Sequence, residues 1–188
     1  MKIILASSNR HKFEEMSKIL KPYGIELKRA DAQVNESDFE TLEESAEDKA
    51  RKAFQMLKKP IIVEDTGVYF QAYKNFPGLY PKRMYLSLGF KGLLKLLENE
   101  KRNAYFKTCI SYYDGFRMKT FSGKLSGKMT ERVHDADKDV LPYEKIFMPK
   151  GHKVTLSAIS REEKNTFSHR GIATRKFAEW FSKNNLRN

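Results

Sequence analysis

The sequence has very little cysteine: Cys109 stands alone among 188 residues. A single cysteine excludes an internal disulfide, and Cys109 is expected to be a reduced, buried packing residue. Long apolar runs are missing too, so no segment is expected to span or anchor in a bilayer. Residues 1–12 lack the apolar core of a secretory signal. Together these absences lead us to expect a cytoplasmic protein.

Runs of one charge sign are also missing, although basic residues are in excess. The 36 Lys and Arg against 24 Asp and Glu give a net charge of +12. This excess favours anionic partners such as phosphorylated metabolites or nucleic acid. A protein that is basic over its whole surface is the alternative. Because five basic residues never stand together, a basic arm for nucleic acid is not favoured.

The composition and the hydrophobic periodicity indicate a globular α/β protein. A hydrophobic content of 40% and an aromatic content of 12% exclude a disordered chain, and the length fits a single domain, 1–188. The Asp114–Gly115 pair predicts a hairpin within 103–125. We therefore expect a mixed sheet flanked by helices. The other expected elements are strands at 2–6, 25–30 and 60–64, and helices through 13–20, 41–57, 83–98 and 170–183.

A short polar loop follows the first expected strand. Ser7, Ser8 and Asn9 stand where the free N–H groups and the dipole of the next helix would attract a phosphate. Lys12, on the first turn of that helix, could add a point charge. Ser and Asn are also common helix caps, and taken alone these residues favour a cap.

Two adjacent acids, Glu64 and Asp65, follow the apolar run 61–63. Neighbouring strand residues face opposite sides of a sheet, so both acids can serve one site only where the strand turns. Thr66 and Gly67 are expected to supply that turn. An acid beside a phosphate loop can hold Mg²⁺, which takes few protein carboxylates. An Asx-turn that satisfies its own backbone is the alternative.

Other charged residues stand close to the expected ends of helices. Glu36 precedes the second expected helix, in a loop able to point at the sheet edge. Lys49 lies on that helix and could turn toward the sheet, where a lysine either snorkels or meets an anion. Lys164, His169 and Arg170 lie around the start of the last helix, where an arginine can grip phosphate oxygens bidentately.

These motifs, in this order, make the sequence resemble the inosine/xanthosine triphosphate pyrophosphatases, a house-cleaning family. SSNRHK at 7–12 looks like that family's T/S-x-N-x-x-K loop, and VEDTG at 63–67 looks like its acidic turn. FPGLY at 76–80 is similar to its F/A-P-G-x-Y element. EEKNTFSHRG at 162–171 is similar to its E-E-K-N-x-x-S-H-R-G signature. The likeness covers nearly the whole chain.

The resemblance implies Mg²⁺-dependent hydrolysis of non-standard purine nucleoside triphosphates (ITP, dITP, XTP) to the monophosphate and pyrophosphate. It also implies a homodimer and an elongated mixed α/β fold with two lobes around a central cleft. Asp65 matches the catalytic acid/base and a metal ligand, and Glu36 matches a second metal ligand. The residues that match substrate contacts are Ser7, Ser8, Asn9, Arg10, His11, Lys12, Lys49, Glu64, Thr66, Leu141, Pro142, Tyr143, Glu144, Lys164, His169 and Arg170.

The sequence departs from the family's G-F-G-Y-D-P-I-F segment at 140–147. Leu141 stands where an aromatic residue packs the base, Pro142 replaces a glycine, and Glu144 replaces an aspartate. Losing the aromatic ring removes about 1–3 kcal/mol of base stacking. A pyrophosphatase with altered base preference is therefore one alternative. A non-catalytic nucleotide or RNA binder is another, ranked below catalysis because every phosphate and metal residue type is present; no nucleic-acid partner is expected.

Overall fold

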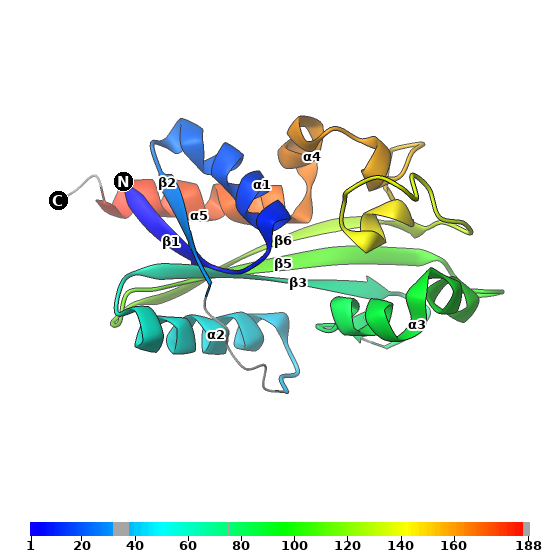
Figure 1. Cartoon of the computed structure of the whole chain (residues 1–188), viewed down its shortest axis with the longest axis horizontal. Helices are drawn as coiled ribbons and strands as arrows, with labels where there is room; N and C mark the ends of the chain where they lie inside the picture. The colour runs from blue at the N-terminus through cyan, green and yellow to red at the C-terminus, as the bar shows by residue number, and fades with distance from the viewer. Residues whose placement is uncertain (32–37, 75, 186–188) are drawn as a thin grey trace.

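A computed structural model describes residues 1–31, 38–74 and 76–185 (Figure 1). Within these residues, seven strands form one sheet in the order β2-β1-β3-β5-β6-β7, with β4 paired to β3. The strands β1, β2 and β3 are parallel, and the other neighbours are antiparallel. The strands are β1 (Lys2–Ala6), β2 (Glu26–Ala30), β3 (Ile61–Phe70), β4 (Pro77–Gly78), β5 (Asn103–Tyr113), β6 (Met118–Met129) and β7 (Phe147–Pro149).

Helices cover both faces of this sheet, with α1 and α5 on one face and α2 and α3 on the other (Figure 1). This arrangement confirms the expected mixed α/β fold. The helices are α1 (Arg10–Leu20), α2 (Leu42–Leu57), α3 (Pro81–Leu96), α4 (Arg161–Phe167) and α5 (His169–Asn185), with 3₁₀ turns η1 (Lys21–Tyr23), η2 (Pro142–Lys145) and η3 (Leu156–Ala158). The arrangement into two lobes and the single-domain boundary stay predictions.

The apolar run at the start of β3 explains why both faces need a helix. Ile62 packs in the cluster beneath α1 and α5, together with Met16 and Phe177. Its neighbour Ile61 packs in the cluster beneath α2, together with Ala53. Because side chains alternate along a strand, a run that is apolar at every position buries both faces of the sheet.

Local sequence signals for two of the elements are confirmed. The side chain of Thr41 accepts from the N–H of Glu44 at 3.2 Å, and the Glu44 carboxylate accepts from the N–H of Thr41 at 3.1 Å. This reciprocal capping box begins α2. Asp114, in the expected hairpin connection, accepts from the backbone N–H of Arg117 at 2.7 Å. Cys109 is buried in β5.

The expectation that the third strand ends at the acidic pair is wrong. β3 continues to Phe70, because β5 pairs with it without interruption over its whole length. Gly67 therefore lies inside a strand and forms no turn. A Cβ there would approach the Tyr69 ring to 2.7 Å and the Gly78 carbonyl oxygen to 2.8 Å. Glycine is needed at this position because β4 crosses so close to the backbone of β3.

The other edge of β3 is paired only at its two ends. β1 pairs with it through Ile61 and Ile62, and β4 pairs with it through Val68 and Tyr69. Between these contacts, no strand in the described part of the chain pairs with the edge at 63–67. Side chains on either face can reach round an open edge of this kind. Both acids can therefore reach one space without the turn that the sequence suggested.

Within the ranges that the structure describes, no helix combines the length and apolar character needed to cross a bilayer.

Candidate active site

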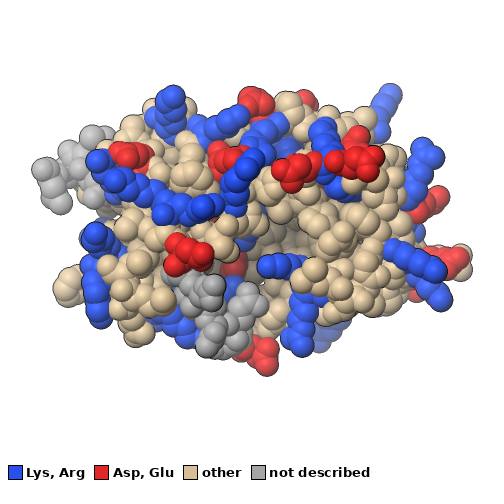
Figure 2. Space-filling model, viewed as in Figure 1, with Lys and Arg blue, Asp and Glu red and all other residues tan. Residues whose placement is uncertain are grey.

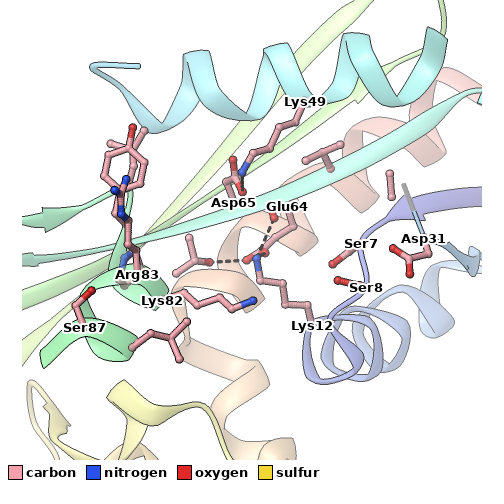
Figure 3. Close-up of a pocket in the computed structure, with 17 residues that line it drawn as sticks. Ser7, Ser8, Lys12, Asp31, Lys49, Glu64, Asp65, Lys82, Arg83 and Ser87 are labelled. Carbon is pink, nitrogen blue, oxygen red and sulfur yellow. Dashed lines mark hydrogen bonds and ion pairs between the residues drawn. The ribbon is translucent and has the colours of Figure 1, made fainter. Parts of the chain in front are cut away.

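A cavity of about 690 Å³ lies at the open edge of β3. It is visible as a hollow near the centre of the face in Figure 2, with Lys and Arg scattered around it. Figure 3 shows several of its charged side chains converging from α1, α2, β3 and α3. Its lining residues are Ala6, Ser7, Ser8, Lys12, Asp31, Lys49, Val63, Glu64, Asp65, Thr66, Leu79, Tyr80, Pro81, Lys82, Arg83, Leu86 and Ser87.

The loop between β1 and α1 supplies both a helix cap and part of the cavity wall. Asn9 is the N-cap of α1, and its Oδ1 accepts from the N–H of Lys12 at 3.1 Å. The hydroxyl of Ser7 accepts from the N–H of Asn9 at 3.2 Å. Ser7 and Ser8 line the cavity next to this helix start. The cap that the sequence favoured is therefore present at Asn9, while the two serines face the open space.

Asp65 is held from the α2 side of the sheet. The Ser45 hydroxyl donates to Oδ2 of Asp65 at 2.8 Å, and Lys49 Nζ donates to Oδ1 at 2.9 Å. Ser45 and Lys49 lie one helical turn apart, so α2 presents both donors on one face. A carboxylate with two oxygens has lone pairs beyond these bonds, and 14% of the Asp65 side chain remains exposed.

Glu64 points to the opposite face, where it is fully buried and surrounded by donors. Arg170 Nε donates to its Oε1 at 3.0 Å, and the Thr66 hydroxyl donates to the same oxygen at 2.5 Å. Lys12 Nζ lies 2.5 Å from Oε2. Burial alone would raise the pKa of Glu64, but the charges of Arg170 and Lys12 outweigh it and hold this pKa well below its usual range. Glu64 is therefore an ionised structural acid.

A chain of buried charges continues from Glu64 away from the cavity. Arg170 also donates to Glu15, and the Lys164 ammonium lies 4.0 Å from the same carboxylate. Lys164 pairs with Glu144 at 2.6 Å. Burial raises the pKa of Glu144, although the Lys164 charge opposes this shift. Lys164, Arg170 and Glu144 do not line the cavity but are joined to it through Glu64.

His169 is buried beside this network. Its ring stacks on Phe106 with centroids 4.8 Å apart and planes 22° apart. Its Nδ1 has no hydrogen-bond partner among the described residues. Burial lowers the pKa of His169 well below its usual value, and the charge of Arg170 lowers it further. The imidazole is therefore neutral in the folded protein near neutral pH.

This neutral histidine predicts a loss of stability in mild acid. The unfolded chain protonates His169 below pH 6.5, whereas the folded chain does not until a much lower pH. Because the unfolded state then binds more protons, the free energy of unfolding should fall by about 1.4 kcal/mol per pH unit below 6.5. Denaturant titrations between pH 7 and 5 should show this slope. In His169→Gln the slope should be smaller by the amount that one titrating group contributes. Equal slopes for the two proteins would contradict the assignment.

The remaining expected site residues lie outside the cavity lining. Arg10 pairs with Glu14 at 2.8 Å, and His11 Nε2 lies 3.3 Å from Asp139. The other residues outside the lining are Leu141 and Pro142, which are half-buried, and Tyr143, which is buried with no partner for its hydroxyl in the described ranges. Glu36 lies outside the residues that the structure describes.

Several residues that line or support the cavity were not predicted from the sequence. Asp31, Lys82 and Arg83 line it, and Ser45 positions Asp65. The position of Ser45, four residues before Lys49 on the same helix, is a signal that could have found it. Lys82 and Arg83 come directly after Pro81, which begins α3, and a basic pair at the start of a helix is a further signal.

The acids of the cavity fit a magnesium ion, which prefers oxygen ligands and takes one or two protein carboxylates. Glu64 is fully buried and paired with two cations, whereas Asp65 is paired with one and is partly exposed, which leaves Asp65 and Asp31 as the available carboxylates. No cluster of three His, Cys, Asp or Glu suited to a metal occurs among the described residues. A donor set this small suits an ion that completes its shell with water and phosphate.

Comparisons with known proteins agree with the motifs. The model of the Ham1 family matches residues 3–180. The chain is 37% identical to a dITP/XTP pyrophosphatase of Thermococcus kodakarensis, covering 98% of this chain and 99% of that protein. It is 39% identical to one of Saccharolobus solfataricus, covering 96% and 93%.

A solved structure described as a HAM1 protein from Coxiella burnetii has the same fold. Its TM-score is 0.82 at 24% identity, and the match covers 97% of this chain and 99% of that chain. Together with the family model and the full-length relatives, this agreement confirms the resemblance seen in the sequence motifs. The chain belongs to the Ham1 family.

Proposed function

We propose that this chain hydrolyses non-standard purine nucleoside triphosphates, such as dITP, ITP and XTP, to the nucleoside monophosphate and pyrophosphate. The names of its full-length relatives, dITP/XTP pyrophosphatases, support the reaction class. The observation that carries the proposal is that Asp65, on the open edge of β3, and Lys12, on the first turn of α1, line one cavity together with Ser7 and Ser8. An acid and a phosphate-binding loop then face the same cavity.

In the proposed reaction, one set of side chains binds the phosphates and Asp65 accepts the proton. Ser7, Ser8 and Lys12 bind phosphate oxygens at the start of α1. Asp65 orients a water and takes its proton as the water oxygen bonds to the α-phosphorus. The bond from the α-phosphorus to the bridging oxygen breaks, and pyrophosphate leaves. Lys49 holds Asp65 in position, so that the carboxylate needs little reorganisation during the reaction.

Asp65 is the described residue that would hold Mg²⁺, and Glu36 is proposed as the second ligand. When bound, the ion neutralises charge on the phosphates and on the leaving pyrophosphate. The proposed homodimer is carried over from the family resemblance, and light scattering on the purified protein tests it. The proposed cytoplasmic location rests on the lone cysteine, Cys109.

Base selection is assigned to the segment 141–144 with Lys164, His169 and Arg170. Lys164 and Glu144 are paired and buried here, so a base can contact them only if their ion pair opens. Leu141 offers aliphatic contact where the resemblance expects an aromatic ring. Stacking should therefore contribute less to the choice of base than hydrogen bonding does.

A panel of nucleoside triphosphates tests the proposed function directly. With Mg²⁺ present, dITP and XTP should release pyrophosphate at least about tenfold faster, in kcat/KM, than dATP, dGTP, dCTP and dTTP. A difference of that size is expected when the wrong base leaves a polar group of the site without its hydrogen-bond partner. The measurement is coupled pyrophosphate release at matched concentrations.

Other outcomes of the panel point to the alternatives. Fast hydrolysis of a pyrimidine or a standard purine would replace the proposed substrate class and identify segment 141–144 as the cause to examine. If no nucleotide is hydrolysed and the protein binds RNA with an affinity that falls steeply as salt rises, the hypothesis of a non-catalytic RNA binder is favoured.

A further inference from the structure

A second cavity, of about 820 Å³, lies where the start of β5, the end of β6 and the turn after β7 meet. It is called the distal cavity below, because it shares no lining residue with the cavity that Asp65 lines. Ala104 lines the distal cavity and stands five residues along β5 from Cys109, the partner of Asp65 in the sheet. That separation is roughly 17 Å along the strand. The two cavities are therefore separate sites.

The lining of the distal cavity is cationic. Lys128, Lys150 and Lys153 line it and are exposed, and within the ranges that the structure describes no carboxylate lines it. None of the three ammonium groups has an ion pair or a hydrogen bond to another described residue. Ammonium groups gathered without an acid repel one another, and an anion among them lowers that energy. The other polar side chains of the lining can all donate hydrogen bonds: Gln71, Asn103, Ser126 and His152.

Paired backbone fixes the positions of the first two lysines. Lys128 lies opposite Met148 in the β6–β7 pair, and the N–H of Lys150 donates to the carbonyl of Ser126 at 2.9 Å. A Cβ at Gly127 would come within 2.3 Å of the Met148 carbonyl oxygen, so glycine is needed for β7 to cross this close. Both lysines are therefore held by hydrogen-bonded strands rather than carried on a free loop.

A tight turn fixes the position of the third lysine. The N–H of His152 donates to the carbonyl of Pro149 at 3.1 Å, and Gly151 between them has a φ of 86°, as a type II turn requires. The His152 ring stacks on Phe167, with centroids 4.7 Å apart and planes 28° apart. Lys153 follows directly, so it extends from a turn that a hydrogen bond and a ring contact both hold.

We propose that the distal cavity binds a small anion carrying two or more phosphate groups, without a metal ion. Several separate cations suit a ligand with several charged groups, and ammonium groups contact phosphate oxygens directly. A bound Mg²⁺ would need carboxylate ligands, which the described lining lacks. The inference goes beyond the proposed function and does not rest on it. It assigns a ligand to part of the basic excess that the cavity at β3 does not use.

Lysine acetylation, followed by peptide mass spectrometry, tests this site directly. Inorganic pyrophosphate is the probe, and EDTA removes metal ions. Pyrophosphate should slow acetylation of Lys128, Lys150 and Lys153, while acetylation of the exposed Lys28 and Lys119 stays unchanged. A nucleoside monophosphate, which has a single phosphate group, should need about a tenfold higher concentration for the same protection, as expected when one charge-assisted contact is lost.

Two double variants separate the cavity from general charge attraction. Lys128→Ala/Lys150→Ala should raise the pyrophosphate concentration that half-protects Lys153 by about tenfold, as expected for two exposed charge contacts. Lys28→Ala/Lys119→Ala is the matched control, because it removes the same charge from exposed lysines of β2 and β6 that line neither cavity. The control should leave the half-protecting concentration unchanged.

The inference is overturned if millimolar pyrophosphate leaves acetylation of the three lysines unchanged. Equal losses in the two double variants would also overturn it, because they would show that net charge and not this cavity attracts the anion. Protection by a single-stranded oligonucleotide at a lower phosphate concentration than pyrophosphate requires would assign the lysines to nucleic acid instead.

Discussion

Asp65→Asn should lower the rate of pyrophosphate release by about 10²–10⁴-fold, the range expected when a general base is removed. The amide has the shape of the carboxylate, and its oxygen can still accept from Lys49, so the fold should be little affected. The melting temperature should therefore stay within a few degrees of the unaltered protein. Coupled pyrophosphate release and a thermal melt on the same preparation measure the two effects.

Asp48→Asn is the matched control for this prediction. Asp48 lies on α2 and pairs with Lys52 at 2.6 Å, but it does not line the cavity. Its substitution should leave turnover unchanged. Turnover by Asp65→Asn at the rate of this control would remove Asp65 from the proposed mechanism.

Arg170→Met should lower the free energy of unfolding by about 3–5 kcal/mol, the typical result of removing one partner from a buried ion pair. Arg170 is 2% exposed and contacts both Glu64 and Glu15. Methionine would fill much of the space but leave two buried carboxylates with less positive charge around them. Chemical denaturation at pH 7 measures the change.

Two further variants separate charge from packing in this prediction. Arg170→Lys keeps the charge but cannot donate to both carboxylates from a rigid fork. Its free energy of unfolding should therefore lie between those of the unaltered protein and Arg170→Met. Arg117→Met removes an exposed arginine near the hairpin turn and should change stability by less than about 0.5 kcal/mol. A cost for Arg170→Met no larger than for Arg117→Met would show that the buried network contributes little.

The network also gives acid a second way to destabilise the protein. The pKa of Glu64 is lowered in the folded state, so the stability it contributes is complete above its usual pKa and is lost as the pH falls below about 4.5. The effect of His169 begins earlier, near pH 6.5. The two contributions therefore fall in successive pH ranges.

Elements with strong local signals were predictable from the sequence. α2 combines a capping box at Thr41 with a stripe of small apolar residues, and both signals act within a few residues. The β5–β6 hairpin follows from Asp114, whose side chain binds the backbone N–H groups just after it. Local hydrogen bonding and periodicity are encoded where they act, so such elements can be derived without knowledge of the fold.

The errors concern contacts between residues far apart in the chain. Gly67 was expected to turn the strand, but its conformation is decided by pairing with β5 and by the close approach of Gly78. The partners of Glu64 include Arg170, 106 residues away, which periodicity cannot reveal. α4 was not predicted, whereas the expected start of the last helix is confirmed: the hydroxyl of Ser168 accepts from the N–H of Gly171 at 3.0 Å.

Because side chains alternate along β3, the face to which Glu64 and Asp65 each point depends on the number of residues that precede them in the strand. Adding or deleting one residue between Ile62 and Glu64 would rotate everything beyond it by half a turn, which would direct the acid of Asp65 at Arg170 and that of Glu64 at Lys49. Adding two would restore the facing directions but shift both acids along the edge. A length change that keeps the chemistry is therefore expected in the connections before Ile61 or after Phe70, and not within the strand itself.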